Sequence, residues 1–495
     1  MKDFLKYTLA TVTGIIAVSA VMMFLGIISL IGMLASEQSK PKVKDNSVFV
    51  LSLSGAMQER SEDDVFSQIT GNAPAVVGLE DVLNSIRKAK DDDNIKGIYI
   101  EAGMFVPDSP ASTQAIRKQL ADFKESGKWI VAYADAYTQS TYYICSVADK
   151  VLLNPQGVVD WRGLAAQPIF LKDLMAKFGV KMQLAKVGKY KSAPEMFTAD
   201  KMSGPNREQV AAYINGIWDT MLTDVAQSRK LSKQRLDAYA DSMVTLAAAE
   251  ELVKMKMVDK LVYASDVKGE IKRLLGIDAD RKINQLTLAD MKNLPGADNG
   301  KGGEVAVYYA YGDVVDTNPG GINTEACIAG DKVCSDLEKL ADDDDVKAVV
   351  LRVNSGGGSA YASEQIWHAV TKLRERKPVV VSMGGMAASG GYYLSCAANY
   401  IYAEPTTLTG SIGIFGMFPD FSGLLTDKLG IKFDEVTTNK HSAFGTMARP
   451  FNAEEMAYLN AYIDRGYRLF IKRVAEGRKM STANVDSIAQ GRVWL

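Results

Sequence analysis

An internal repeat is the feature that most constrains the fold of this chain. Three segments recur later in the sequence, and their start points are separated by 251, 250 and 251 residues. The pairs are DDDNIKGIYI from Asp91 with DDDDVKAVVL from Asp342, YYICSVADKVLLNP from Tyr142 with YYLSCAANYIYAEP from Tyr392, and FGVK from Phe178 with LGIK from Leu429. Such a constant separation predicts two copies of one domain in tandem.

Each copy alternates short β-rich runs with amphipathic stretches. Strands are expected at 48–53, 97–100, 129–133, 305–309, 348–353 and 379–383, and helices at 79–90 and 362–376. Strands that alternate with helices predict an α/β fold with largely parallel pairing in each copy. The expected domains are an anchor and stalk (1–45), the first copy (46–295), a Gly-rich linker (296–304) and the second copy (305–495).

The N-terminal segment is apolar. From residue 7 to residue 35 the chain carries no charged side chain. This run exceeds the ~20 residues that a helix needs to cross a bilayer, and a cleavable signal peptide would have a shorter apolar core. We therefore expect an uncleaved helix in a lipid bilayer. Charge leaves its orientation open, because lysines precede it at positions 2 and 6 and follow it at 40, 42 and 44.

The composition argues against several functions. A formal net charge of -2 and the lack of a basic stripe with aromatics disfavour nucleic-acid binding. The four cysteines show no Cys-x-x-Cys spacing, and no phosphate-loop signature occurs, so neither a metal nor a cofactor is expected. Cys327 and Cys334 lie close together in sequence, so the sequence does not decide between a disulfide and two free thiols in an oxidising compartment.

Two glycine-rich segments of the second copy each follow an expected strand and open a helix. They are NSGGGS from Asn354 and MGGMAASGG from Met383. Glycine lets the backbone approach a ligand closely, and free N–H groups beside a nucleophile form an oxyanion hole. Ser389, at such a strand-to-helix turn, is the candidate nucleophile. The alternative is that these small residues only permit tight helix packing.

A serine nucleophile needs a base. The chain has only His368, which stands inside an expected helix, and His441. The first copy offers Lys191, in the segment GKYKSAP. A lysine acts as a base only when neutral, which requires burial or positive neighbours such as Lys186 and Lys189 to lower its pKa. The alternative for this lysine cluster is a solvated surface.

The repeat places these candidates in different copies. The first copy carries Gln139 at the position of Ser389, and the second carries His441 at the position of Lys191. Each copy therefore holds half of a dyad, which predicts one complete site across the boundary between them. His441 stays open as the alternative base, since histidine is the commoner one.

Four segments carry a resemblance to a known family. RVNS from Arg352, SMGGMAASGGY from Ser382, LTGSIGIFG from Leu408 and GKYKSA from Gly188 closely resemble the signal peptide peptidase A family in its long bacterial form, also called protease IV. The resemblance covers almost the whole chain, anchor included. It implies a Clp-protease/crotonase-like fold in each copy and a serine protease with Ser389 as nucleophile and Lys191 as general base.

Further expectations follow from the family resemblance and the glycine loops. The N–H of Gly390, with that of Gly357 or Gly358, is expected to hold the oxyanion. Expected substrates are cleaved signal peptides and other apolar peptides. The family resemblance also implies a homo-oligomer, namely a tetramer, at the bacterial cytoplasmic membrane with the catalytic part on the extracytoplasmic side.

The sequence departs from the family pattern at two places. Gly356 stands where the family has proline, which predicts a looser oxyanion loop. The first copy continues past Thr245 to residue 295, whereas the second stops at the matching point, Leu495, so a closing segment is expected to be missing. Two rival functions are acyl-CoA chemistry on a crotonase-like fold, which needs no serine nucleophile, and a membrane-tethered scaffold with vestigial sites.

Overall fold

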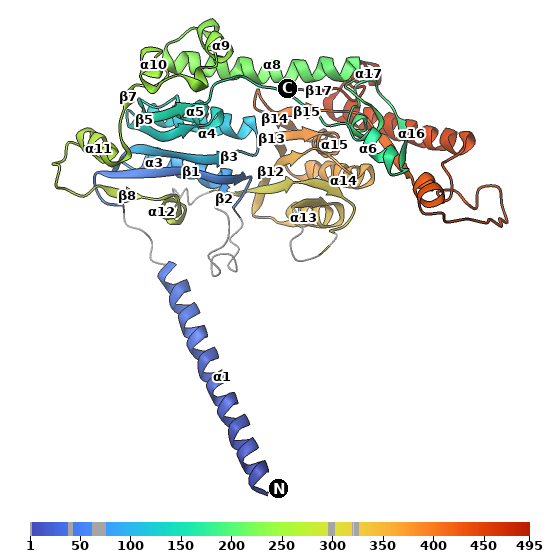
Figure 1. Cartoon of the computed structure of the whole chain (residues 1–495), viewed down its shortest axis with the longest axis horizontal. Coiled ribbons are helices and arrows are strands. Elements are labelled where there is room, and N and C mark those ends of the chain that lie inside the picture. Colours follow the sequence, from blue (N-terminus) through green and yellow to red (C-terminus); the bar gives the residue numbers. More distant parts are fainter. Residues whose placement is uncertain (1, 38–42, 62–75, 296–301, 319, 321–325) are drawn as a thin grey trace.

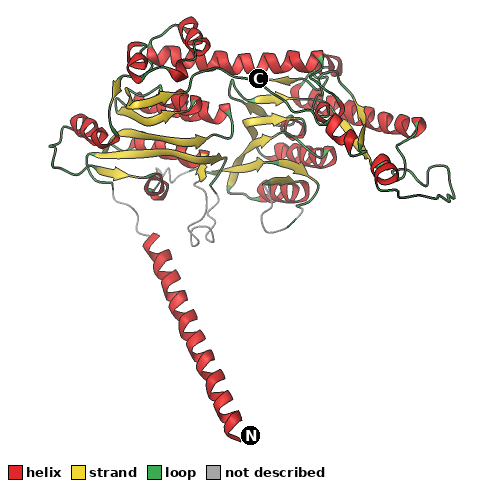
Figure 2. Ribbon diagram, viewed as in Figure 1, coloured by secondary structure: helices red, strands yellow, loops and turns green. Residues whose placement is uncertain are grey.

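The body of the protein is built from two α/β units. The computed structural model describes residues 2–37, 43–61, 76–295, 302–318, 320 and 326–495. Within them, two sheets of mostly parallel strands lie side by side with helices packed against their faces (Figures 1 and 2). The predicted duplicated α/β fold is confirmed.

The first sheet has the strand order β2-β1-β3-β4-β5-β7, with β8 also paired to β1, and its pairings are parallel. Its strands are β1 (Ser47–Gln58), β2 (Val76–Gly78), β3 (Ile95–Val106), β4 (Trp129–Tyr137), β5 (Lys150–Val159), β7 (Lys260–Leu261) and β8 (Asn284–Leu286). Its helices include α3 (Leu79–Asp91), α4 (Pro110–Lys124), α5 (Gln139–Cys145), α9 (Lys233–Asp241), α10 (Ala249–Lys254), α11 (Val267–Leu275) and α12 (Leu288–Asn293).

The second sheet has the order β17-β15-β13-β12-β9, with β14 also paired to β13. Its pairings are parallel except that of β15 with β17. Its strands are β9 (Glu304–Tyr311), β12 (Val346–Ser355), β13 (Val379–Ala388), β14 (Tyr400–Tyr402), β15 (Leu408–Gly410) and β17 (Val493–Trp494). The surrounding elements are β10 (Asp313–Val315), β11 (Cys327–Ala329), α13 (Gly330–Asp342), α14 (Ala360–Arg376), α15 (Gly390–Ser395), α16 (Ala453–Arg478) and α17 (Thr482–Ile488).

Local sequence explains these elements. Helix α3 buries Leu79, Val82, Ile86 and Ala89, whose spacing of three or four residues forms one apolar face against the sheet. Every strand and helix expected from the sequence lies within an observed element of the same type. Along the central strand β12, buried residues alternate with more exposed ones, so one face of the strand packs against the core.

The two units interlock through a segment of the first copy. After β5, the chain leaves its own sheet and forms α6 (Lys172–Lys177), β6 (Lys181–Lys186) and α7 (Glu195–Thr198) beside the second unit (Figure 1). Strand β6 pairs antiparallel with β16 (Phe415–Asp420) of the second copy. The long helix α8 (Gly204–Arg229) then spans both units on its way back (Figure 1).

The N-terminal helix stands apart from this body. Helix α1 (Lys2–Glu37) extends away from both sheets (Figure 1). The most apolar 18-residue window within residues 2–26 has a mean hydropathy of 2.1 and is wholly unburied. The helix is long and apolar enough to cross a membrane, and its exposure rules out a role as a core helix of the body. These properties fit a membrane-anchored protein.

The cysteines are all free thiols. Cys145 and Cys396 are buried, whereas Cys327 and Cys334 are half-buried. The sequence did not decide whether Cys327 and Cys334 form a disulfide, and in this structure they do not.

Candidate active site

Ser389 lies at the turn between β13 and α15. Its φ of 53° and ψ of -117° place a non-glycine residue in a strained part of backbone space. Two hydrogen bonds fix the turn: Ser389 N–H donates to the Gly410 carbonyl at 2.9 Å, and Tyr393 N–H donates to the Ser389 carbonyl at 2.8 Å. The strand-to-helix turn expected from the sequence is present, and it holds the hydroxyl in a defined position.

Lys191 reaches this hydroxyl from the other copy. It lies in the loop between β6 and α7, and its Nζ is 2.9 Å from Ser389 Oγ. Nζ also contacts both the Ser411 hydroxyl and the Ser411 carbonyl at 3.0 Å. The side chain is buried, with only 3% of Lys191 exposed. The two Ser411 oxygens thus hold the Lys191 amine next to the Ser389 hydroxyl.

Two glycines of the second copy let the lysine loop come this close. A Cβ on Gly491, where φ is 75°, would lie 2.6 Å from Lys191 Cβ. A Cβ on Gly413 would lie 3.3 Å from Lys191 Cδ. The neighbouring Tyr190 N–H donates to the Gln490 carbonyl at 2.9 Å. The loop is therefore seated by close backbone packing, which a larger residue at position 491 would prevent.

Burial changes the ionisation of the lysine. Removal from water disfavours the ammonium form and lowers the pKa of Lys191 to about 8. Its hydrogen-bond partners are a hydroxyl pair and a carbonyl, which carry no negative charge. Lys186 and Lys189, expected from the sequence to contribute, have exposed side chains. Burial is the cause of the shift, and it leaves a useful fraction of neutral amine at mildly alkaline pH.

Backbone N–H groups lie beside the serine. Gly357 N–H donates to Ser355 Oγ at 3.1 Å and is thereby occupied. Gly358 N–H and Gly390 N–H have no hydrogen-bond partner within the described parts of the chain. A Cβ on Gly357 would lie 2.8 Å from Ser389 Cβ, so the loop touches the serine. Gly358 therefore suits an oxyanion hole better than Gly357.

The loop that contains Gly356, the glycine at the family's proline position, is held by two backbone hydrogen bonds to Val314. Val314 N–H donates to the Gly357 carbonyl at 3.0 Å, and Ser359 N–H donates to the Val314 carbonyl at 2.8 Å. A Cβ on Gly356 would meet only Met386 Sδ, at 3.4 Å. Position 356 thus has room for a side chain, and these two bonds hold the loop where glycine replaces proline.

Neither histidine contacts this site. His441 Nε2 is 3.7 Å from Glu454 Oε1, and its ring packs against Tyr458 with centroids 5.6 Å apart. His368 lies on α14 and lines a groove between α13 and α14. Lys191, and not His441, is the basic side chain bonded to Ser389.

The equivalent region of the first copy is closed. Gln139, at the position of Ser389, accepts hydrogen bonds from the N–H groups of Arg162 and Gly163 at 3.0 and 3.1 Å. The fully buried Trp161 stands at the position of Ser411. This region has glutamine in place of Ser389 and tryptophan in place of Ser411, so it lacks the hydroxyl that Lys191 contacts in the second copy.

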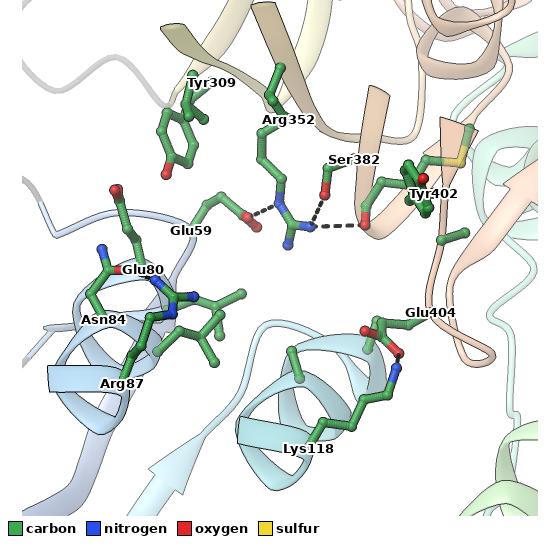
Figure 3. A pocket seen from close by; sticks show the side chains of 18 residues that line it. Glu59, Glu80, Asn84, Arg87, Lys118, Tyr309, Arg352, Ser382, Tyr402 and Glu404 are labelled. Atoms are coloured by element: carbon green, nitrogen blue, oxygen red, sulfur yellow. Dashed lines mark hydrogen bonds and ion pairs between the residues drawn. The ribbon is translucent and has the colours of Figure 1, made fainter. Parts of the chain in front are cut away.

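The contact between the copies also includes a buried ion pair. The Arg352 guanidinium of β12 donates to the Glu59 carboxylate of the first copy, to Ser382 Oγ at 3.1 Å and to the Met383 carbonyl at 2.9 Å (Figure 3). Nearby, Lys118 Nζ and Glu404 Oε2 are 2.7 Å apart. These groups line a cavity of about 510 Å³ that includes neither Ser389 nor Lys191. The Arg352–Glu59 pair joins the two copies near the site, and breaking a buried pair typically costs about 3–5 kcal/mol.

Ser411 is a site residue that sequence reasoning missed. It belongs to the segment LTGSIGIFG, which carried a family resemblance but no assigned role. The repeat gave no hint, because the first copy has Trp161 there. The available signal was a serine that directly follows Gly410 and precedes Gly413 by two residues.

A buried amine hydrogen-bonded to a serine hydroxyl, beside backbone N–H groups that have no partner among the described residues, is the arrangement expected of a hydrolase that uses serine as its nucleophile. Comparison with known families agrees. Residues 122–278 and 371–495 match the model of Peptidase family S49, and residues 323–407 match that of Clp protease. The chain belongs to peptidase family S49 and is a serine protease.

Individual relatives span most of the chain. Protease 4 of Salmonella typhi is 38% identical over 84% of this chain and 67% of its own length. Protease 4 of Haemophilus influenzae is 33% identical over 95% of this chain and 79% of its own. The chloroplastic serine protease SPPA of Arabidopsis thaliana is 27% identical over 92% of this chain and 66% of its own. The family resemblance found in the sequence is confirmed.

Proposed function

We propose that Ser389 is the nucleophile and Lys191 the general base of a membrane-anchored peptidase that degrades cleaved signal peptides and other apolar peptides. The observation that carries the proposal is the 2.9 Å contact between Lys191 Nζ and Ser389 Oγ, made by a lysine whose pKa burial lowers to about 8. A neutral amine at hydrogen-bond distance is what a serine hydroxyl needs for activation.

The mechanism follows from this geometry. Neutral Lys191 takes the Ser389 proton while Oγ attacks the peptide carbonyl, and the resulting oxyanion accepts hydrogen bonds from Gly390 and Gly358 N–H. The Lys191 ammonium then protonates the leaving amine as the C–N bond breaks, which leaves an acyl-enzyme. Lys191 then takes a proton from a water molecule as that water attacks the ester. The Lys191 ammonium finally returns the proton to Ser389 Oγ as the ester C–O bond breaks and the acid product leaves.

The substrate class rests on three supports. The resemblance in sequence is to a signal peptide peptidase family, and relatives bear the names Protease 4 and serine protease SPPA. Met386, three residues before Ser389, is partly exposed next to the glycine loop and offers an apolar contact. Helix α1 ties the body to a bilayer, where released signal peptides collect.

The test compares substrates on the full chain in detergent. A peptide with the apolar core of a bacterial signal peptide should be hydrolysed with a kcat/KM at least about tenfold higher than an equally long peptide rich in lysine and glutamate, since each buried apolar group contributes about 1.5–3 kcal/mol. The Ser389→Ala variant of the full chain is the control for background hydrolysis. Equal or faster cleavage of the charged peptide would contradict the apolar substrate class while leaving the Ser389 assignment intact.

Location and assembly complete the proposal. We place α1 in the cytoplasmic membrane of a bacterium with the catalytic body on the extracytoplasmic side, where signal peptides are cut from exported chains. We also propose a homo-oligomer, with four chains as the family resemblance implies.

A further inference from the structure

One amide side chain of α8 contacts the lysine loop on both sides of Lys191. Gln209 Nε2 lies 3.1 Å from the Tyr190 carbonyl oxygen and 2.8 Å from Ser192 Oγ. Only 2% of Gln209 is exposed, in a helix that spans both units (Figure 1). Because a buried amide without hydrogen bonds is unfavourable, Gln209 and the loop around Lys191 depend on each other.

The same amide also reaches the second copy. Val493 N–H, in β17, donates to Gln209 Oε1 at 3.0 Å. The residue before it, Arg492, accepts the Ser411 N–H on its carbonyl oxygen at 2.7 Å. Gln209 therefore joins the loop that carries Lys191 to the strand that holds Ser411, and Ser411 is the residue that contacts the Lys191 amine.

The Tyr190 carbonyl depends on Gln209. Within the parts of the chain that the structure describes, no other group donates a hydrogen bond to this oxygen. Tyr190 itself is buried. Without the amide, the carbonyl would need a water molecule as its donor, and a water can enter only if the loop moves away from α8. Such a movement would also hydrate the Lys191 amine.

The buried amide occurs in one copy only. Helices α8 and α16 have the same length, and their left-handed C-caps Lys230 and Lys479 are 249 residues apart. At the same separation, the residue of α16 that corresponds to Gln209 is Tyr458, which is 57% exposed. The helix is thus retained in both copies, whereas the amide is present only in the copy that carries the lysine. This asymmetry links Gln209 to Lys191 rather than to the helix.

The charged and titratable groups on the elements around Lys191 have other partners or face solvent. Glu195 accepts hydrogen bonds from Ser203 and Asn206. Glu208 pairs with Arg492 at 3.0 Å and accepts from the Tyr190 hydroxyl. The remaining groups are exposed, although Lys186 Nζ comes within 3.5 Å of the Lys191 carbonyl oxygen; they are Lys186, Lys189 and Arg207. Removal from water is the cause that lowers the pKa of Lys191, so access of water to the amine decides its ionisation.

We propose that Gln209 is a positioning residue for the reaction, because its amide holds the loop of Lys191 against the strand next to Ser411 and keeps water away from the amine. It acts through the backbone of residue 190 and the side chain of residue 192, and not on the substrate. The inference rests on the proposed role of Lys191 as general base.

The test is the pH dependence of kcat/KM for the full-length Gln209→Met variant in detergent. Methionine has a similar volume but neither donates nor accepts these hydrogen bonds. With a more hydrated amine, the limb on which activity rises should move from about 8 to higher pH, by about one unit or more. Activity at neutral pH should therefore fall about tenfold or more, and it should return close to the wild-type value on the alkaline plateau.

A purely structural role of Gln209 would give a different curve. Loss of folded protein lowers activity by the same factor at every pH and leaves the limb in place. The matched control is Gln114→Met. Gln114 is 4% exposed on α4, and its Oε1 accepts from the Thr406 hydroxyl of the second copy at 2.9 Å. It is therefore another buried amide that joins the two copies, and its variant should keep the wild-type limb.

A second variant decides the matter if Gln209→Met does not fold. Gln209→Glu keeps an acceptor for Val493 N–H, but it cannot donate to the Tyr190 carbonyl, and its carboxylate favours the ammonium form of Lys191. Its limb should also move to higher pH. A limb that stays in place in the Gln209 variants, or that moves equally in Gln114→Met, would overturn the positioning role. Retained activity of Lys191→Met would instead refute the base itself, so the two failures are distinguishable.

Discussion

Replacing Ser389 by alanine is expected to lower kcat/KM for an apolar peptide by about 10⁴-fold or more, since loss of the nucleophile in such a site removes covalent catalysis altogether. The hydroxyl is the only group removed, and the Ser389 backbone bonds to Gly410 and Tyr393 remain. The measurement is steady-state hydrolysis by the full chain in detergent.

The control for this variant is its fold. The alanine protein should keep its melting temperature to within a few degrees, because the substitution removes one partly exposed oxygen and creates no cavity. Retention of most of the activity by a normally folded Ser389→Ala protein would rule out the proposed nucleophile. It would also reopen the acyl-CoA chemistry considered from the sequence, which keeps the oxyanion loops without a serine.

Replacing Lys191 by methionine should be almost as damaging. Methionine fills a similar volume and suits the buried site, but it cannot accept the Ser389 proton. A general base typically contributes about 10²–10⁴-fold, and we expect a loss of kcat/KM in that range or beyond. His441→Ala serves as the matched control and should keep nearly full activity, since His441 contacts Glu454 and Tyr458 rather than Ser389. The reverse pattern would assign the base to His441.

Much of the fold could be predicted from the sequence because the pattern of strands and helices occurs twice in the chain. Two copies of the same pattern of apolar strands and amphipathic helices gave each element twice, and the observed strands contain every expected one. Strand ends were less predictable: β13 continues past the expected Met383 to Ala388, because glycine and alanine carry no strong strand signal. The domain boundaries at residues 46, 296 and 305 stay a prediction.

The pairing of Ser389 with Lys191 was inferred from the asymmetry of the copies, but its surroundings were not. The path of β6 onto β16 depends on long-range packing, which leaves no local pattern in the sequence. Ser411 was missed for the same reason, since its role appears only when the lysine lies against it. The neighbouring Lys186 and Lys189 suggested electrostatic help, whereas the structure assigns the pKa shift of Lys191 to burial.

The most direct test of the central claim is the pH dependence of kcat/KM, which reports ionisations of the free enzyme. Lys191 must be neutral to act as a base, and burial lowers its pKa to about 8. Activity should therefore rise with pH along a single limb centred near that value and level off above it, in the wild type and in His441→Gln alike. A limb near about 6.5, the ordinary value for histidine, that disappears in His441→Gln would contradict the account.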